Sequence, residues 1–414
     1  MAPVVDVAIA GGGPAGSTLA ILLGRAGFEV ELYEARRFPR EKPCGEGIMP
    51  AGVAVLERLG LRTAVGGRPL PSVRYHAFGL EAEAAFPKRG ERRFSALAQR
   101  RLTLDAVLLE AARATCGVRI HEEAPVEGAV VEARRAVGLG VGGELRRARL
   151  VVGADGIESP VRRSLGLDAP SRGRRVGLRT HFRLAAGQSL PERLDIFVGD
   201  GAELYAAPLP DGELLVAALC DRAALAGGAR AALARFIADQ PLLGSWLEGA
   251  TPITEPAGRA PVTRRARAGF APGAVLLGDA ARATDPLTAG GIAHALVTAE
   301  LLASFVPQIL GQSVGHGGER WLAAFDLRRR RLLRAHGWLT RTLVFLAARP
   351  GRAKLTLRAM RAAPAVMRTL LGIAGGIDFQ PPVLASTAAS SATALPPSSA
   401  TDQNATLSQR AGSP

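Results

Sequence analysis

The sequence has few cysteines and no long uninterrupted hydrophobic run. Only three of its 414 residues are cysteine (Cys44, Cys116 and Cys220), and no two of them have the Cys-x-x-Cys spacing. This argues against structural disulfides and against a cysteine-ligated metal, so we predict no metal site. The uncharged stretch 301–318 is interrupted by proline, glycine, glutamine and histidine, and falls well short of the roughly 20 apolar residues of a membrane span.

The sequence also shows no sign of a secretory signal peptide. No basic segment precedes the first apolar run, which starts at Val4 and includes Asp6, so we expect a cytoplasmic protein. Hydrophobic residues make up 48% of the chain, enough for a substantial core, and the length suggests two or three domains. Residues 386–414 are rich in Ser, Thr, Ala and Pro and contain no aromatic residue, which predicts a disordered tail.

Acidic residues are scarce in one part of a strongly basic chain. The net charge is +15, and residues 319–369 hold 13 Lys and Arg against two acids. Tryptophan, phenylalanine and leucine alternate with these cations, as in basic amphipathic helices. Two interpretations stay open: peripheral contact with an anionic membrane, or an ordinary solvated helical face. No recognition motif accompanies the arginines, so we expect no nucleic-acid partner.

The most informative feature present is a glycine-rich turn close to the start of the sequence. Residues 4–10 are apolar and β-branched, residues 17–25 repeat apolar side chains at helical spacing, and residues 28–33 return as a second strand. The turn between them reads GGGPAG over residues 11–16. This succession predicts a βαβ unit with a glycine turn at the helix N-terminus.

Each glycine of this turn has a physical reason. Gly11 permits the tight turn, Gly13 lets the backbone approach a pyrophosphate, and Gly16 lets helix and sheet pack closely. Glu34 lies 18 residues after Gly16, at the end of the second strand, where a carboxylate can accept both ribose hydroxyls of an adenosine. The unit therefore predicts a dinucleotide-binding site.

A second stretch, residues 138–143, matches the same glycine spacing. It is followed by the polar residues 144–147 and then by the strand-like residues 149–153. This context indicates a hairpin turn between two strands and not a second nucleotide site.

Three further segments follow at intervals typical of one large family. They are residues 42–47 (KPCGEG), residues 152–156 (VGADG) and residues 277–281 (LGDAA), the last followed by Asp285-Pro286 and Gly290-Gly291. Together with the first turn, they resemble the FAD-dependent oxidoreductases that include aromatic-ring hydroxylases, geranylgeranyl reductases and flavin-dependent halogenases. The resemblance spans about residues 4 to 300 and implies FAD as the cofactor.

The fold that we expect is α/β, with a Rossmann-like FAD-binding domain and an inserted α+β substrate domain. Segments 176–184, 193–198, 203–208 and 213–220 alternate apolar and polar residues, which predicts an antiparallel sheet. The resemblance places this sheet over the flavin as the roof of the substrate pocket. The predicted domains are a discontinuous FAD-binding domain (1–70, 96–171 and 266–318), a substrate domain (71–95 and 172–265), a basic helical region (319–385) and the tail (386–414).

Several site residues follow from these motifs. Asp279 ends an apolar strand, where its carboxylate can accept from a ribityl hydroxyl, although an ordinary helix N-cap is the alternative. The resemblance implies that Asp155 and Gly156 shape a turn near FAD and the nicotinamide donor, and that Arg101 contacts the phosphate or ribityl chain, with Arg100 as the alternative. Val126 resembles the apolar residue beside the adenine.

The loop at residues 43–47 is expected beside the isoalloxazine ring, with Cys44 or Glu46 as catalytic candidates; Cys44 as a packed small side chain is the alternative. Backbone donors of residues 286–292 could stabilise a reduced, anionic flavin. Ala289 stands where relatives usually carry glycine. The complete predicted FAD-binding set is Gly11, Gly13, Pro14, Ala15, Gly16, Glu34, Ala35, Arg36, Cys44, Gly45, Glu46, Gly47, Arg101, Val126, Asp155, Gly156, Gly278, Asp279, Pro286, Gly290, Gly291 and Ile292.

The choice of reaction depends on residues 203–208 (ELYAAP). They lack the Tyr-x-Trp-x-Phe-Pro signature usual in geranylgeranyl reductases, and no Trp-x-Trp-x-Ile-Pro motif of halogenases is present. The segment is more similar to bacterial FAD monooxygenases. We therefore predict an oxidoreductase that uses NAD(P)H as co-substrate and molecular oxygen to hydroxylate an aromatic or polyketide-derived molecule.

Two alternatives stay open. One is a flavin reductase that saturates an isoprenoid alkene, and the other is a non-catalytic, membrane-associated flavoprotein that carries electrons. The sequence has a single dinucleotide fingerprint, so the nicotinamide would bind without a Rossmann domain of its own. The sequence makes no prediction of oligomeric state.

Overall fold

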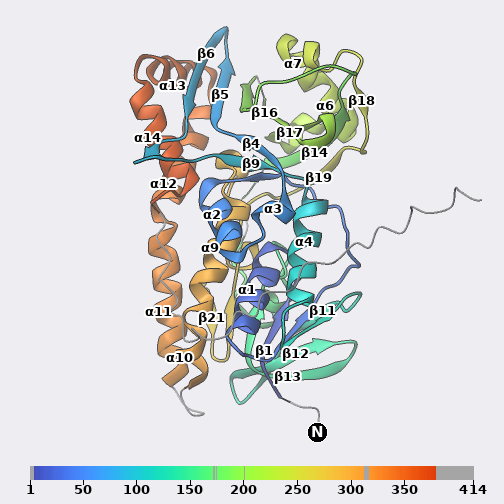
Figure 1. The fold of residues 1–414 in the computed structure, drawn as a ribbon, viewed down its shortest axis with the longest axis vertical. Helices are drawn as coiled ribbons and strands as arrows, with labels where there is room; N and C mark the ends of the chain where they lie inside the picture. The colour runs from blue at the N-terminus through green and yellow to red at the C-terminus, as the bar shows by residue number, and fades with distance from the viewer. Residues whose placement is uncertain (1–3, 171–172, 174, 200, 312–316, 379–414) are drawn as a thin grey trace, which may run out of the picture. The chain divides into compact units, whose positions relative to one another are not determined.

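A mixed sheet of eight strands forms the base of the protein (Figure 1). The computed structural model describes residues 4–170, 173, 175–199, 201–311 and 317–378, so the predicted tail lies outside the described residues. The main path of the sheet runs β10-β2-β1-β13-β12-β11, with β22 beside β13 and β21 beside β22. Its strands are β1 (Val5–Ala10), β2 (Val30–Tyr33), β10 (Val118–His121), β11 (Val126–Glu132), β12 (Arg135–Val141), β13 (Glu144–Gly153), β21 (Phe270–Ala271) and β22 (Ala274–Leu276).

The parallel half of this sheet contains the predicted βαβ unit. Strands β10, β2, β1, β13 and β22 pair in parallel, and helix α1 (Pro14–Arg25) connects β1 to β2. Helix α1 contacts α4 (Arg101–Arg113) and α9 (Gly291–Ala303), while α2 (Pro50–Leu59) contacts α9. Val7 and Ile9 of β1 belong to the apolar cluster of these helices, whereas Val5 and Ala8 belong to a second cluster that includes Leu139 and Val161. Both faces are therefore covered and the strands are buried, as their apolar sequences predicted.

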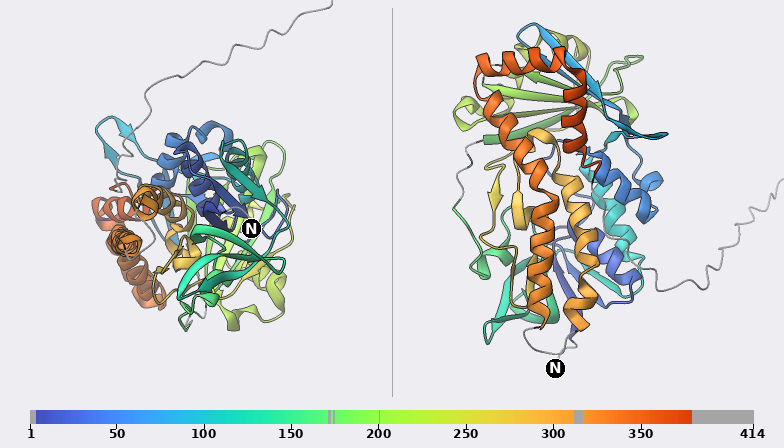
Figure 2. Two further views of the ribbon diagram at one scale, coloured as in Figure 1. Left: turned by 90° about the horizontal axis from the view of Figure 1, so that it is seen from below. Right: turned by 90° about the vertical axis from the view of Figure 1, so that its left-hand side faces the viewer.

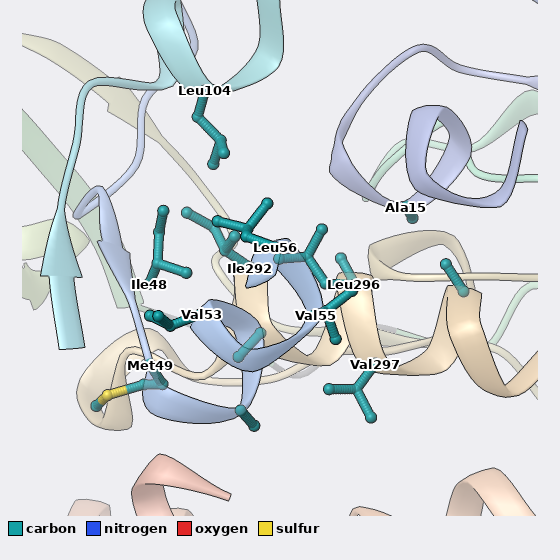
Figure 3. Close-up of a cluster of buried hydrophobic side chains, with 14 of the residues drawn as sticks. Ala15, Ile48, Met49, Val53, Val55, Leu56, Leu104, Ile292, Leu296 and Val297 are labelled. Atoms are coloured by element: carbon teal, nitrogen blue, oxygen red, sulfur yellow. The ribbon is translucent and has the colours of Figure 1, made fainter. Parts of the chain in front are cut away.

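Apolar residues from four helices and one short strand meet above the glycine-rich turn. Ile48 and Leu56 lie beside Ile292 of α9, with Leu104 and Ala15 approaching from α4 and α1 (Figure 3). All five side chains are buried. Segments far apart in the sequence are thus fixed around the same point, where the motifs converge.

Gly16 is required for the contact between α1 and β1. A Cβ atom at this position would lie 1.9 Å from the carbonyl oxygen of Gly11. We expect Gly16→Ala to lower the free energy of unfolding by about 3 kcal/mol or more, because backbone must move to relieve the overlap. Urea denaturation measures this. Gly291→Ala is the matched control, because no atom lies within 4 Å of a Cβ there; an equal loss in both variants would contradict the assignment.

The second glycine-rich stretch is a hairpin, as the sequence indicated. Strand β12 pairs antiparallel with β13, with Val141 opposite Glu144. Only Gly142 and Gly143 form the turn, both at positive φ (59° and 75°). This confirms the prediction that residues 138–143 are not a nucleotide site.

A second sheet of eight strands comes mostly from residues 175–259. Its main path is β18-β14-β17-β16-β15-β5-β6, with β19 beside β14. The pair β15–β5 is parallel, which corrects the expectation of a wholly antiparallel sheet. The β5–β6 hairpin precedes the other strands by about a hundred residues of chain, so no tight turn forces it to run antiparallel to β15. The strands are β5 (Ser72–Ala77), β6 (Leu80–Ala85), β14 (Arg175–Arg183), β15 (Leu194–Val198), β16 (Ala202–Pro208), β17 (Glu213–Asp221), β18 (Thr251–Pro252) and β19 (Ala257–Arg259).

After α9, the chain continues through helices to the end of the described residues (Figure 2). They are α10 (Val306–Gly311), α11 (Gly317–Leu332), α12 (Arg334–Ala347), α13 (Pro350–Ala362) and α14 (Pro364–Gly375). Helices α13 and α14 contact β6, and α12 contacts both of them. Within the predicted basic region, α13 and α14 therefore pack against the edge of the second sheet, whereas α11 contacts α9, α10 and β21.

One segment is apolar enough for a membrane span, although the sequence interpretation found none. Gly291–Gly311 meets the length and hydropathy of a span, but 78% of its most apolar window is buried inside the protein. This segment begins ten residues before the uncharged stretch 301–318 that the sequence analysis considered, and it includes the whole apolar helix α9. Its apolarity is explained by contacts with α1, α2 and α11.

The remaining elements are short. They are β3 (Gly47–Ile48), β4 (Arg68–Leu70), β7 (Lys88–Arg89), β8 (Arg92–Arg93), β9 (Ala96–Ala98), β20 (Arg264–Arg265), α3 (Arg62–Val65), α5 (Pro160–Ser164), α6 (Gly228–Ala238), α7 (Pro241–Trp246), α8 (Asp279–Arg282) and the 3-10 turns η1 (Pro210–Gly212), η2 (Arg222–Leu225) and η3 (Pro286–Thr288).

Candidate active site

A large cavity lies where the first sheet, the motif loops and the second sheet meet. It encloses about 1680 Å³, counted out to its open mouth. The glycine-rich turn, the 42–47 loop and the 283–292 segment form its walls on the side of the first sheet. Strands β14, β16 and β17 contribute Leu178, Tyr205 and Leu219 on the opposite side.

Most of the predicted FAD-binding residues line this cavity. They are Gly13, Pro14, Ala15, Cys44, Gly45, Glu46, Gly47, Arg101, Gly156, Gly278, Asp279, Pro286, Gly291 and Ile292. The others lie outside its walls: Gly11, Gly16, Glu34, Ala35, Arg36, Val126, Asp155 and Gly290. Among these, Ala35 and Arg36 are exposed, and Val126 pairs with Val141 in the first sheet. The contacts of the individual residues with FAD stay predictions.

Glu34 is fixed against the glycine-rich turn. It directly follows β2, and its carboxylate accepts hydrogen bonds from the backbone N–H groups of Gly12 (2.8 Å) and Arg36 (3.1 Å). Arg40 lies 3.4 Å from the same carboxylate. The side chain is thus held at the end of the strand, where the motif requires an acceptor for ribose.

The backbone around the cavity is open to an anionic ligand. No side chain caps the N-termini of α1 or α9, so their first N–H groups have no side-chain partner. A Cβ at Gly13 would have only the Arg40 guanidinium within 4 Å, and a Cβ at Gly45 or Gly291 would have no neighbour at all. These positions leave room for a phosphate and a ring close to the backbone.

Two charged side chains on the cavity wall have no partner in the described part of the chain. The Asp279 carboxylate accepts no hydrogen bond there, and the Lys42 ammonium forms no ion pair. Burial, together with the cations Arg101 and Arg40, lowers the pKa of Lys42. An acceptor and a cation are thus available to a ligand with hydroxyl and phosphate groups, which FAD has. The sequence interpretation assigned no role to Lys42.

The structure distinguishes the two neighbouring arginines. Arg101 is buried on the cavity wall and forms a bidentate ion pair with Asp105, at 2.7 and 2.6 Å. Arg100 instead points away and contacts Glu41 and Glu213. Arg101 is therefore the one that can approach a ligand in the cavity.

Glu46 occupies a fully buried position in the 42–47 loop. Its backbone has φ 54°, and one carboxylate oxygen accepts from the backbone N–H of Arg101 at 3.1 Å. The other oxygen lies 2.8 Å from Nε2 of His181, whose Nδ1 lies 3.0 Å from the Thr254 hydroxyl. Because both oxygens have partners inside the protein, this geometry favours a positioning residue over the predicted catalytic role. His181 was not found from the sequence, because only the folding of β14 brings it to the loop.

Cys44 lies on the cavity wall and is only partly buried. Its sulfur accepts from the backbone N–H of Glu46 at 3.3 Å. Cys116 is exposed and Cys220 is buried in the second sheet. Cys44 is thus the cysteine that can meet a bound substrate, and its catalytic role stays a prediction.

Tyr205 joins the second sheet to the loop before α9. Its buried hydroxyl lies 3.2 Å from the Glu203 carboxylate and 3.4 Å from the carbonyl oxygen of Leu287. Glu203 in turn contacts Arg175 at 2.7 Å, and Arg175 contacts Asp285 at 2.9 Å. Burial and the Glu203 carboxylate raise the pKa of Tyr205 well above its usual value, which keeps the phenol protonated.

Two buried histidines support the 286–291 loop from behind. His294 and His336 contact edge to face with centroids 4.1 Å apart, and a Cβ at Gly290 would lie 2.4 Å from Nε2 of His336. Burial and the nearby Arg282 guanidinium lower the pKa of His336 to about 4. Both effects disfavour the charged imidazole.

This pKa makes stability depend on pH. Between about pH 6.5 and pH 4 the unfolded chain binds a proton at His336 that the folded protein does not, so acid favours unfolding. From pH 7 to pH 5, the wild type should lose about 2 kcal/mol more free energy of unfolding than His336→Asn. Chemical denaturation at both pH values measures the difference. An equal loss would show that the pKa of His336 is not lowered in the folded protein.

Two smaller apolar cavities adjoin the main one. They lie between β5 and β15 on one side and α12–α14 on the other, and their volumes of about 450 and 530 Å³ include open solvent at their mouths. The first shares Met49, Val73, Leu194 and Ala289 with the walls of the main cavity. The two share Leu343 and Met360, among other residues. Apolar space therefore continues from the main cavity toward the C-terminal helices.

The fold and the cavity define a dinucleotide-binding oxidoreductase of the FAD type. The model of the FAD binding domain matches residues 4–183. Menaquinone reductase of Mycobacterium tuberculosis is 30% identical over 348 residues, covering 75% of this chain and 81% of that protein. The chain therefore belongs to the FAD-dependent oxidoreductase family that includes geranylgeranyl reductase-like flavoproteins and aromatic-ring monooxygenases.

Other relatives include both reductases and a monooxygenase. Digeranylgeranylglycerophospholipid reductase of Methanoculleus marisnigri is 30% identical over 320 residues, covering 72% of this chain and 75% of the relative. The 6-methylpretetramide 4-monooxygenase of Streptomyces rimosus is 36% identical over 179 residues, or 39% and 41% of the two chains. Among solved structures, the myxobacterial chondrochloren halogenase CndH superposes with a TM-score of 0.73, at 26% identity and 82% coverage of both chains.

Proposed function

We propose that the protein is an FAD-dependent reductase that saturates a carbon–carbon double bond in the prenyl chain of a lipid-soluble substrate, with NAD(P)H as the reductant. The sequence interpretation placed this reaction second, after monooxygenation. The observation that carries the proposal is the apolar space that extends from the main cavity to the C-terminal helices. A compact aromatic or polyketide substrate would not need it.

The walls of this space suit an isoprenoid chain. The first small cavity is lined by leucine and methionine side chains, and no charged residue of the described chain lines it. The leucines and methionines include Leu339, Leu343, Met360, Met367 and Leu371. Methionine and leucine adapt to a flexible branched hydrocarbon, and each buried methylene adds roughly 0.8 kcal/mol to binding. Tyr75 and Tyr205 border the same space and can orient a polar head group.

The reaction balances without a further reagent. NAD(P)H gives a hydride equivalent and the medium gives a proton, so the alkene gains two hydrogens and NAD(P)+ forms. FAD, when bound, supplies the two-electron chemistry that joins the nicotinamide to the substrate. The residues of this chain hold the cofactor through the open backbone at Gly13 and Gly291 and through Asp279, and keep water out with the apolar wall. Cys44 lines the wall, and in this proposal its thiol donates the proton to the substrate.

Two of the relatives that align with most of the chain are named for reduction. Menaquinone reductase and digeranylgeranylglycerophospholipid reductase align with more than two thirds of the chain, beyond the FAD-binding region and into the second sheet. This supports a substrate that contains an isoprenoid chain. We expect a cytoplasmic protein, since its candidate spanning segment is mostly buried.

Monooxygenation is the second candidate. Its support is the 36% identity with 6-methylpretetramide 4-monooxygenase, which covers 39% of the chain, and the ELYAAP sequence at residues 203–208. Both reactions need FAD and NAD(P)H, so oxygen dependence separates them.

Mass spectrometry of the product tests the proposal. The full-length holoenzyme is incubated under nitrogen with NADH or NADPH and a prenylated phospholipid, whose only reducible carbon–carbon bonds are those of its prenyl chains. A gain of two hydrogens without oxygen is the expected result. A gain of one oxygen, seen only in air, would support monooxygenation, and flavin reduction without product would support an electron carrier; either contradicts the proposal.

A substitution tests whether the two small apolar cavities hold the prenyl chain of the substrate. Leu343 lines both of them, so Leu343→Trp should raise KM for a long prenyl chain about tenfold and leave a short one almost unchanged. Leu327→Trp, at an exposed position of α11, is the control. An equal effect on both chain lengths would show that the cavities do not hold the substrate.

A further inference from the structure

We infer that the outer faces of α12, α13 and α14 form a docking surface for an anionic phospholipid bilayer. These faces carry unpaired cations together with large exposed apolar side chains. Binding to a bilayer needs no catalytic turnover, so this inference stands apart from the proposed reaction. Both observations come from the same three helices, which contact one another.

The charge of this surface has one sign. No acidic residue occurs from residue 327 to residue 377, whereas 12 Lys and Arg do. Arg329 and Arg330 pair with Asp326 of α11. Within the described residues, the exposed cations of the three helices form no ion pair: Arg334, Arg341, Arg349, Lys354, Arg358, Arg361 and Arg368. Such a cluster remains available to anionic head groups.

Large apolar side chains stand among these cations. Trp338 and Phe345 of α12 are 56% and 62% exposed, Leu355 of α13 is 67% exposed and Val366 of α14 is 54% exposed. Four of the ten large hydrophobic residues that are exposed in the described part of the chain lie on these helices. Aromatic and aliphatic side chains at this exposure gain free energy when they enter the boundary between head groups and acyl chains.

The two kinds of side chain share one face of α12. Trp338, Arg341 and Phe345 follow at spacings of three and four residues, so they lie on one stripe. Leu339 and Leu343, on the other side, line the apolar cavity. The guanidinium of Arg352 lies over the Phe345 ring at 4.0 Å, which joins the outer faces of α12 and α13.

This pattern fits a lipid surface better than a solvated face or a protein partner. A solvated face has no use for exposed tryptophan and phenylalanine, and a stable protein interface usually has few unpaired cations at its centre. In a bilayer, the cations contact the head groups while their stems and the apolar side chains lie deeper. If the substrate is lipid-soluble, as proposed, the same helices separate the bilayer from the apolar cavities.

Vesicle co-sedimentation of the full-length holoenzyme tests the inference. The probes are vesicles of phosphatidylglycerol mixed with phosphatidylcholine, and vesicles of phosphatidylcholine alone. We expect binding to the anionic vesicles only, weakened by salt. Arg358→Glu with Arg361→Glu should lower the partition coefficient at least about tenfold, and Trp338→Ser with Leu355→Ser should lower it comparably.

Matched controls show whether a loss of binding is specific to this surface or follows from any change in exposed charge or apolar side chains. Arg222→Glu with Arg267→Glu reverses two other exposed arginines, and Val131→Ser with Leu242→Ser removes two other exposed apolar side chains. These variants should bind like the wild type, with unchanged thermal midpoint and FAD content in all cases. No binding to anionic vesicles, equal losses in the controls, or a dimer that the α12–α14 substitutions dissociate would each overturn the inference.

Discussion

Gly13→Val is expected to fold normally and to lose FAD. A Cβ at Gly13 has only the end of the flexible Arg40 side chain within 4 Å, and the backbone there (φ −73°) is open to any residue. The added methyl groups therefore enter the cavity at the N-terminus of α1, where the pyrophosphate needs close backbone contact. Flavin absorbance per chain, after reconstitution and gel filtration, should show at least about tenfold weaker retention of FAD.

The stability of Gly13→Val is the control for this result. Its free energy of unfolding without FAD should fall by no more than about 1 kcal/mol, which is the usual cost of losing a favoured N-cap residue. This contrasts with Gly16→Ala, which overlaps the backbone of Gly11. If Gly13→Val retained FAD at the wild-type level, the open backbone at this turn would not be a phosphate site.

Glu46→Ala should have the second large effect, on stability and on the cavity wall. It removes a fully buried carboxylate and leaves the Arg101 backbone N–H and His181 Nε2 without partners. Breaking a buried pair of this kind costs about 3 kcal/mol or more. Urea denaturation measures the loss, and alanine also tolerates the positive φ at this position poorly.

Glu46→Gln distinguishes a positioning role from acid–base chemistry. Glutamine can accept from the Arg101 backbone and donate to a neutral His181, so stability should return to within about 1 kcal/mol of wild type. If Glu46 only positions the loop, the pH profile of kcat should also match the wild type. Loss of activity with unchanged stability would instead support the catalytic role predicted from the sequence.

Local signals predicted the first sheet well. The βαβ unit was readable because the apolar periods of β1, α1 and β2 agree with the glycines between them. The hairpin at Gly142 and Gly143 was readable because polar residues and then a strand follow it, and not a helix. The parallel β15–β5 pair was missed, because it joins segments separated by more than a hundred residues and no local pattern records which strands become neighbours.

For the site as well, local sequence patterns predicted some features, whereas others depend on contacts between distant segments. The glycine-rich turn and the Gly278–Asp279 motif could be placed at the cavity from the sequence because each directly follows an apolar strand. The Glu46–His181 contact and the Tyr205–Glu203–Arg175 network depend on how the second sheet lies against these loops. The apolar cavities could not be predicted either, because they arise from side chains of α12–α14 that read in sequence as an amphipathic face.

Anaerobic reoxidation of the bound flavin tests the central claim most directly. The holoenzyme is reduced with one equivalent of NAD(P)H under nitrogen and then mixed with a prenylated phospholipid, which has no quinone ring to accept electrons, while flavin absorbance is recorded. The account predicts that the absorbance of oxidised flavin returns without oxygen, at a rate that depends on substrate concentration. Absorbance that stays low until air is admitted would contradict it.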